Sequence, residues 1–337
     1  MPGMTLSGLG EAYRLYGPGV IASAIVAAAA TFLSEHYQAP VMLMALLLGM
    51  AVGFLADADS RTKAGIEFTA RHILRFGVAL LGLRITLEQI LALGWSPLLM
   101  VVGSVVLTIL LSVLLARLFG FTWMFGMLTG GATAICGASA ALALSAALPA
   151  NERKEQATLF TVIGVSALST LAMILYPTIA RSLGLDPAAA GIFLGGTIHD
   201  VAQVVGAGYS MGPETGDTAT VVKLMRVAML VPVIFCAALL TRASRTAGDA
   251  QKTPLLPGFA VAFVLLAAVN SSGWLPPALP ELGSDLSKVC LVSAIAALGM
   301  KTRLQELVRV GLRPILLMVL ESALLVGLVI GFLRFSS

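Results

Sequence analysis

The sequence predicts an all-α polytopic membrane protein with about nine to eleven membrane segments. Of the 337 residues, 58% are hydrophobic and only 11% are charged, whereas roughly a quarter of a soluble domain is charged. Apolar stretches long enough to cross about 30 Å of hydrocarbon recur along the whole chain. Because no polar stretch is long enough for a soluble domain, we expect one transmembrane domain over residues 1–337.

Charged residues, proline or glycine bound the apolar stretches in order along the chain. The first stretch is about as short as a signal-peptide core, but Arg14 is its only preceding cation and Glu11 offsets it. We therefore expect a retained first span. The predicted segments lie at residues 18–33, 40–56, 66–83, 97–116, 122–148, 157–180, 188–209, 218–241, 256–272, 287–300 and 314–333.

Two internal matches indicate a repeat that relates segments 40–180 and 188–334. "ALLGLRITLEQILALGWSP" from Ala79 matches "AALGMKTRLQELVRVGLRP" from Ala296, which sets Gly82 over Gly299 at an offset of 217 residues. At an offset of 65, "GMLTGGATAI" matches "GIFLGGTIHD". Both matches are inverted if segments 122–148 and 188–209 are re-entrant hairpins, as in many secondary transporters. They disagree if both segments span, and the loop charges are compatible with either arrangement.

The net charge of +4 does not indicate nucleic-acid binding, because the basic residues lie singly between apolar stretches. Contact with anionic lipid headgroups explains them better. Loop cations collect on the side of the N-terminus, so we expect that end in the cytoplasm. Cys136, Cys236 and Cys290 are far apart in the sequence, which indicates neither a disulfide framework nor a metal site.

The fifth segment contains the first candidate binding site, "GGATAICGASAALALS". Its glycines are expected to interrupt the helix, and its small polar side chains would lie beside the exposed backbone. In lipid such a break must be lined by protein or water, and a half-helix N-terminus there would attract an anion. Close helix packing by small residues is the alternative. The candidate substrate-binding residues are Gly130, Gly131, Thr133, Cys136, Gly137 and Ser139.

The seventh segment, "GGTIHDVAQVV", repeats the glycine pair and adds ionisable residues. A carboxylate at bilayer depth costs roughly 2.5 to 3.5 kcal/mol, so Asp200 or His199 is expected to couple transport to a proton or ion. His199 and Gln203 share a helical face, while Asp200 points about 100° away. Because the fifth segment carries no charge, we expect any proton coupling in the seventh. The candidate binding residues here are Gly195, Gly196, Thr197 and Gln203.

Lys223 and Arg226 form a cationic pair at helical spacing at the start of the eighth segment. They could attract an anion into the site or pair with Asp200, since a neutral pair is cheaper to bury. They could also extend to the headgroups from a helix end.

Enzyme signatures are absent from the sequence. HExxH, GxSxG and Walker A motifs do not occur, and His36, His72 and His199 lie in separate segments. We therefore expect no enzyme, no metal site and no cofactor. A hydrolase with Ser139 as nucleophile and His199 as base is a weaker alternative.

The motifs resemble those of the YeiH-type sulfate exporter family of bacterial inner-membrane proteins. The matching stretches are "ALLLGMAVG", "LRFGVALLGLRITL", "TAICGASAALA", "GGTIHDVAQVVGAG" and "VVKLMRVAML". One departure is Asp200, where that family commonly has Glu. The resemblance implies a multi-pass inner-membrane protein related in fold to sodium/proton antiporters and bile-acid symporters, built from inverted repeats. It also implies export of a small anion such as sulfate, a related oxyanion or a sulfonate.

Together these features predict a secondary transporter that moves a small anion by alternating access, coupled to H⁺ or Na⁺. The alternative is a cation/proton antiporter that uses Asp200, and a non-transporting membrane scaffold or intramembrane enzyme is less favoured. The expected partners are the anion, the coupling ion and the lipid bilayer, with a homo-oligomer left open and no nucleic acid.

Overall fold

In the computed structural model, every regular element of the described residues is a helix, as the sequence predicts. The structure describes residues 6–37, 39–57, 59–86, 88, 91, 93–148, 154–240, 258–273, 275–276, 278–302 and 311–336. The loop at residues 149–153, which bears on whether the fifth segment spans or re-enters, lies outside the described residues. The chain divides into two compact units, each assembled from two separate stretches of sequence.

Unit 1 comprises residues 1–89 and 259–303. Its long helix α15 packs against α1, α2 and α4, which makes α15 the centre of this unit. The third predicted segment is not one regular helix, because a π-helical turn and a final 3₁₀ turn interrupt it. The helices are α1 (Leu6–Tyr37), α2 (Val41–Ala51), η1 (Gly53–Ala56), α3 (Lys63–Phe68), η2 (Thr69–Ile73), α4 (Leu74–Leu80), η3 (Leu81–Leu83), α14 (Gly258–Ser271) and α15 (Ala278–Lys301).

Two helix crossings in unit 1 are related by the same offset of 217 residues as the sequence match. A Cβ atom on Gly82 would lie 2.3 Å from the carbonyl oxygen of Phe263, and one on Gly299 would lie 2.3 Å from that of Leu46. Only glycine permits so close an approach between helix backbones, which is how small residues hold membrane helices together. Residues that correspond at this offset therefore also make corresponding contacts in the structure.

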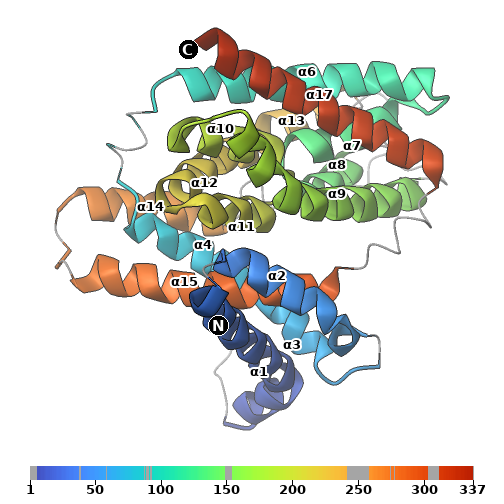
Figure 1. Ribbon diagram of the computed structural model, residues 1–337. Helices are drawn as coiled ribbons and strands as arrows, with labels where there is room; N and C mark the ends of the chain where they lie inside the picture. The colour runs from blue at the N-terminus through green and yellow to red at the C-terminus, as the bar shows by residue number, and fades with distance from the viewer. Residues whose placement is uncertain are drawn as a thin grey trace. The chain divides into compact units, whose positions relative to one another are not determined.

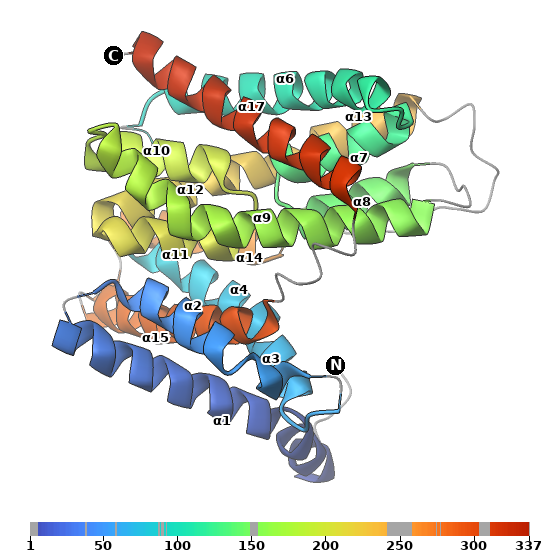
Figure 2. The ribbon, with the colours of Figure 1, turned by 45° about the vertical axis from the view of Figure 1, so that its right-hand side comes forward.

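Unit 2 comprises residues 90–258 and 304–337. α6 and α17 lie side by side in both ribbon views (Figures 1 and 2). α7 packs on α6, α10 packs on α12 and α17, and α9 runs along α8 and α11. The helices are α6 (Ser96–Leu118), α7 (Trp123–Ala134), α8 (Ala138–Ala147), α9 (Lys154–Ser182), α10 (Pro187–Thr197), α11 (Val201–Met211), α12 (Pro213–Ala228), α13 (Leu230–Leu240) and α17 (Leu312–Ser336).

Each of the eleven predicted segments lies on helical structure, so the polytopic all-α prediction is confirmed. Among the described residues, six helices are long and apolar enough to cross a membrane by length and composition: Gly10–Tyr37, Ser96–Leu118, Lys154–Ser182, Pro213–Ala237, Ala278–Lys301 and Leu312–Phe335. The fifth and seventh segments are not among the six, because each divides into two short helices.

Candidate functional site

The fifth segment breaks at Ile135, Cys136 and Gly137, between the end of α7 and the start of α8. Gly137 adopts a positive φ of 66°, a backbone conformation that glycine reaches without the steric cost other residues meet. Gly137 is the N-cap of α8 and offers no side-chain cap, although the Cys136 thiol lies against the backbone N–H of Ala140 in the first turn. The positive dipole end of α8 is therefore not neutralised by a carboxylate cap.

The seventh segment breaks at Ile198, His199 and Asp200, between α10 and α11. Asp200 is the N-cap of α11, and its Oδ1 accepts a hydrogen bond of 3.1 Å from the backbone N–H of Ala202. Its own N–H donates to the Ser169 hydroxyl on α9. A carboxylate thus occupies the positive end of α11, in contrast to α8.

The glycine pairs do not form the breaks, which corrects the sequence-based expectation for Gly130, Gly131, Gly195 and Gly196. All four lie inside α7 or α10, and each break begins several residues later. Two of them permit close packing instead. A Cβ atom on Gly130 would lie 2.4 Å from Ser112 Cβ on α6, and one on Gly195 would lie 2.5 Å from the Ala219 carbonyl oxygen on α12. The packing alternative is the better description of these residues.

The two breaks adjoin each other and form one junction. A Cβ atom on Gly137 would lie 3.7 Å from the backbone of His199. The His199 Nδ1 atom also lies 3.1 Å from the carbonyl oxygen of Thr133 at the end of α7. The breaks of the fifth and seventh segments therefore meet, as the internal match between these segments predicts.

Lys223, on α12, is fully buried and joins the two breaks. Its ammonium donates to the carbonyl oxygen of Ile135 at 2.7 Å, to that of Ile198 at 3.0 Å, and to that of His199. Since an ammonium has three N–H donors, all of them are used on backbone carbonyls.

Arg226 lies one helical turn further along α12 and is also fully buried. Its Nε and Nη2 atoms donate to α7, to the carbonyl oxygens of Ala134 and Thr133, both at 2.7 Å. Its Nη1 atom donates to Gly195 and Ile198 of the α10 end, at 3.1 Å and 3.0 Å. The planar guanidinium therefore holds the C-terminal ends of two helices together.

These contacts explain how two cations can be buried in a membrane segment. The last carbonyl groups of α7 and α10 lack partners within their own helices, and an unpaired carbonyl in lipid costs several kcal/mol. Lys223 and Arg226 supply those partners and face the negative dipole ends of both helices. Both side chains are 0% exposed and end on internal carbonyl groups rather than at the protein surface. Asp200 lies within electrostatic range of Lys223, so the ammonium also has a carboxylate in its surroundings.

His199 is held by both of its ring nitrogens. A carbonyl oxygen can only accept, so the contact with Thr133 places a hydrogen on Nδ1. Nε2 lies 2.9 Å from the Ser322 hydroxyl on α17, and that hydroxyl also lies 2.8 Å from the Met318 carbonyl oxygen. The Ser322 hydroxyl has one hydrogen, which it donates either to Nε2 of a neutral His199 or to the Met318 carbonyl oxygen. Protonation of His199 therefore requires only one hydroxyl to turn.

Comparison with known proteins identifies the family. A family model described as Conserved hypothetical protein 698 matches residues 18–318. The UPF0324 membrane protein CT0845 of Chlorobaculum tepidum is 56% identical over 317 residues, which cover 94% of this chain and 88% of that protein. The chain belongs to the UPF0324 family. The UPF0324 membrane protein TauZ of Paracoccus denitrificans is 53% identical over 310 residues, 91% of this chain and 92% of that protein.

The UPF0324 family is the YeiH-type family that the sequence motifs indicate, so the resemblance is confirmed. UPF0324 membrane protein RB0971 of Rhizobium meliloti is 52% identical over 309 residues, 91% of this chain and 89% of that protein. No solved structure matches the chain. The names of the relatives and the apolar helices agree on a multi-pass membrane protein.

The remaining candidate residues of this UPF0324 protein are divided between the junction and its surroundings. Cys136 is buried within electrostatic range of Lys223 and Arg226. Thr197 is buried and donates to its own helix at Phe193. Ser139, at the start of α8, is exposed.

Gln203 is buried on α11, and its side-chain oxygen has no hydrogen-bond partner among the described residues. Because buried polar atoms are nearly always hydrogen-bonded, this unpaired oxygen next to the junction is a candidate acceptor for a ligand, whereas an anion could bind only to the amide NH₂ group.

Sequence reasoning missed Glu321 and Ser322 on α17, both buried in unit 2. The Thr129 hydroxyl of α7 donates to Glu321 at 2.7 Å, and the Thr133 hydroxyl lies 3.4 Å from its other oxygen. The α7 side of the junction therefore has a carboxyl group against it, although its own segment carries no charge. A single Glu within the apolar stretch 314–333 was the available signal, by the reasoning applied to Asp200.

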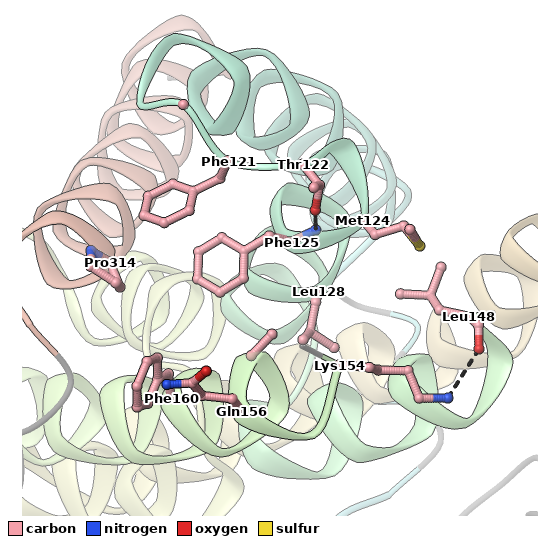
Figure 3. Close-up of a pocket in the computed structure, with 12 residues that line it drawn as sticks. Phe121, Thr122, Met124, Phe125, Leu128, Leu148, Lys154, Gln156, Phe160 and Pro314 are labelled. Carbon is pink, nitrogen blue, oxygen red and sulfur yellow. Dashed lines mark hydrogen bonds between the residues drawn. The ribbon is translucent and has the colours of Figure 1, made fainter. Parts of the chain in front are cut away.

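A separate pocket of about 540 Å³ lies where α7, α9 and α17 begin (Figure 3). The rings of Phe121 and Phe125 line it with their centroids 4.6 Å apart, and Lys154 donates to the Leu148 carbonyl oxygen at its edge. None of the candidate residues from the sequence lines this pocket. Its lining is mostly apolar, with Lys154 as the one charged residue among those that line it.

Proposed function

We propose that this UPF0324 protein is a secondary transporter that carries a small anion, sulfate or a related oxyanion or sulfonate, by alternating access. The observation that supports it best is the pair of fully buried cations, Lys223 and Arg226, fixed where two broken helices meet. Discontinuous helices with ion-binding ends are a recurring feature of secondary transporters.

The start of α8 is the best location for the anion. Its N-cap, Gly137, offers no side chain, whereas the carboxylate of Asp200 already occupies the corresponding position on α11. Lys223 and Arg226 are close enough to act electrostatically on Cys136, two residues before α8 begins. An oxyanion there would accept hydrogen bonds from the first N–H groups of α8 and from the exposed Ser139 hydroxyl.

In this proposal Lys223 and Arg226 act on the anion mainly by their charge. Since the three donors of Lys223 and most of those of Arg226 are used on carbonyl groups, the cations would attract the anion by charge and hold the break open for it. Gln203 could bind the anion only through its amide NH₂ group, because its unpaired side-chain oxygen is an acceptor.

Flux measurements in proteoliposomes test the proposal. Purified protein should accumulate labelled sulfate, sulfite or a simple organosulfonate when a pH or Na⁺ gradient is imposed. Ser139→Ala should weaken anion uptake, while Ser182→Ala, at the exposed end of α9, should leave it unchanged. If none of the anions moves and Na⁺ instead drives proton flux, the protein is a cation/proton antiporter and the anion proposal is wrong.

We propose the bacterial inner membrane as the location, with the N-terminus in the cytoplasm. The loop cations on the side of the N-terminus support this orientation. A cysteine introduced at Gly10 should react with a membrane-impermeant maleimide only in inside-out vesicles. Reaction in intact spheroplasts would reverse the orientation.

A further inference from the structure

Glu321 is a buried carboxyl group that the transport proposal has not used. It lies well inside α17, an apolar helix, and its side chain is 0% exposed. A carboxylate in such a place is costly unless a cation or a proton compensates its charge. The groups that face it in the described part of the chain are hydroxyls: Thr129 and Thr133 from α7 and Ser112 from α6.

The hydrogen bonds around Glu321 suit both of its protonation states. The Thr129 hydroxyl lies 2.7 Å from the carboxyl oxygen and 3.1 Å from the Phe125 carbonyl oxygen of its own helix. If Glu321 is ionised, Thr129 donates its single hydrogen to it. If Glu321 is protonated, it donates to Thr129, which then donates to Phe125. Gain or loss of a proton therefore leaves no buried donor unpaired at Thr129.

Two hydroxyls on α6, those of Thr108 and Ser112, lie one turn apart on the same side of that helix, and both residues are 0% exposed. Neither side-chain oxygen has a partner within ordinary hydrogen-bond geometry among the described residues, although Ser112 faces Glu321 at longer range. Ser112 contacts α7 at Gly130, one residue from Thr129. Unsatisfied buried hydroxyls are rare in native structures, and here Ser112 lies near the carboxyl group while Thr108 lies one turn away from Ser112 on α6.

Charged and titratable groups near this cluster are few. α7 and α10 carry none, and on α6 the only one is Arg117, near its C-terminal end. On α17 itself, Arg313 and Arg334 lie near the two ends. The titratable residues of α9 lie near its ends or, for Tyr176, against the Phe193 ring of α10: Lys154, Glu155, Tyr176 and Arg181.

The break after α10 contributes His199, which contacts Ser322, the neighbour of Glu321. A positive charge on His199 would stand beside those of Lys223 and Arg226, both of which act on it electrostatically. A proton on Glu321 removes a charge, whereas a proton on His199 adds a third cation. This comparison favours the carboxyl group as the proton carrier.

Thr133 connects Glu321 to the junction. Its hydroxyl lies against the carboxyl group, while its carbonyl oxygen accepts from Arg226 and His199. A change of charge on Glu321 therefore acts on the residue at which α7 ends.

We propose that Glu321, within the hydroxyl cluster of Thr108, Ser112, Thr129 and Thr133, is the site that binds and releases the coupling proton. Only the coupling of this proton to transport rests on the proposed function. Proton binding by Glu321 can be tested without transport. His199 is then a positioning residue that links α17 to the break, and Asp200 is the cap of α11.

Infrared difference spectroscopy on the purified protein tests proton binding directly. A pH titration should reveal a carboxylic acid C=O band that is lost in Glu321→Gln. Glu214→Gln, which changes an exposed carboxyl group on α12, should retain the band. Thr129→Val should move the pH midpoint upward, because the ionised form loses a donor, and Thr129→Ser should restore it. A band that survives in Glu321→Gln would overturn the inference.

Flux measurements then separate the inference from the proposed function. In wild-type proteoliposomes a pH gradient should accelerate anion uptake, and in Glu321→Gln uptake should be equal with and without the gradient. A full response to the gradient in Glu321→Gln would overturn the coupling role. If the wild type moves no anion, the proposed function fails, while the infrared band still decides whether Glu321 binds a proton. If Glu321→Gln does not fold, the midpoint shift in Thr129→Val carries the test, and an unchanged midpoint would contradict the inference.

Discussion

Lys223 and Arg226, one turn apart on α12, both donate to the carbonyl oxygen of Ile198, each at 3.0 Å. A carbonyl oxygen has two lone pairs, so one atom can bind both cations. Lys223 also donates to the His199 carbonyl oxygen and Arg226 to that of Gly195, so the seventh segment is anchored to α12 at three backbone oxygens, of which Ile198 is the shared one. The remaining donors extend the same attachment to the fifth segment.

Replacing Lys223 by Met should strongly destabilise the protein. The change leaves three buried carbonyl groups without this donor, at roughly 1 to 3 kcal/mol for each one that finds no other partner. Lys154→Met is the matched control, because Lys154 donates to one carbonyl group at 3.2 Å. Thermal unfolding in detergent should show a much larger drop in Tm for Lys223→Met. Equal drops would mean that the carbonyl network contributes little.

Replacing Gly137 by Ala should impair transport more than stability alone explains. Gly137 and Gly184 share a φ of 66°, so Ala is strained at both, but Gly137 combines that φ with a ψ of −129°, outside the left-handed helical region, and Ala there should cost about 1 to 3 kcal/mol. The nearest atom to a new Cβ at Gly137 is 3.7 Å away, and none lies within 4 Å at Gly184. Both variants should lower Tm, Gly137→Ala at least as much as Gly184→Ala, but only Gly137→Ala should slow anion flux. Equal anion flux in both variants would show that the backbone geometry of the break does not affect transport.

Ala in place of Gly82 or Gly299 should destabilise unit 1 to a similar extent. Each new Cβ would lie 2.3 Å from a carbonyl oxygen of the facing helix, so the helices must separate. Gly327→Ala on α17 is the control, since nothing lies within 4 Å, and there alanine should be neutral or slightly stabilising. Tm values for the three variants check this. A large difference between Gly82→Ala and Gly299→Ala would argue against corresponding contacts in a repeat.

Replacing Gln203 by Leu should separate stability from function. The change removes a buried oxygen that has no described partner, so Tm should stay the same or rise. If Gln203 contacts the transported anion, uptake at low substrate concentration should fall. Gln203→Leu with normal uptake and lower Tm would show that the amide is structural.

Most of the architecture could be predicted from the sequence because a bilayer imposes a simple length requirement. Eleven apolar stretches gave eleven helical segments, and the polar interruptions marked the two that are broken. The positions of the breaks could not be predicted from the glycine pairs. Glycine lowers helix propensity, but Gly130 and Gly195 gain close packing against Ser112 and Ala219, which keeps those stretches helical.

Most residues of the candidate site could be predicted from the sequence, but the contacts between them could not. Lys223 and Arg226 were recognised as a pair, but their acceptors are backbone atoms that no sequence motif displays. Glu321 was missed because it comes more than 100 residues after the break it faces. Its hydroxyl partners on α6 and α7 become neighbours only once α17 packs against both helices.

Because the acceptors at the junction are peptide carbonyls, almost any residue at Ala134, Ile135 or Ile198 would present the same oxygen. The donors cannot be exchanged in this way, because each set of hydrogen bonds depends on one side chain of α12, Lys223 or Arg226. Random mutagenesis of this region should therefore tolerate apolar substitutions of similar volume at Ala134, Ile135 and Ile198, whose side chains are buried, while any substitution at codons 223 and 226 should fail.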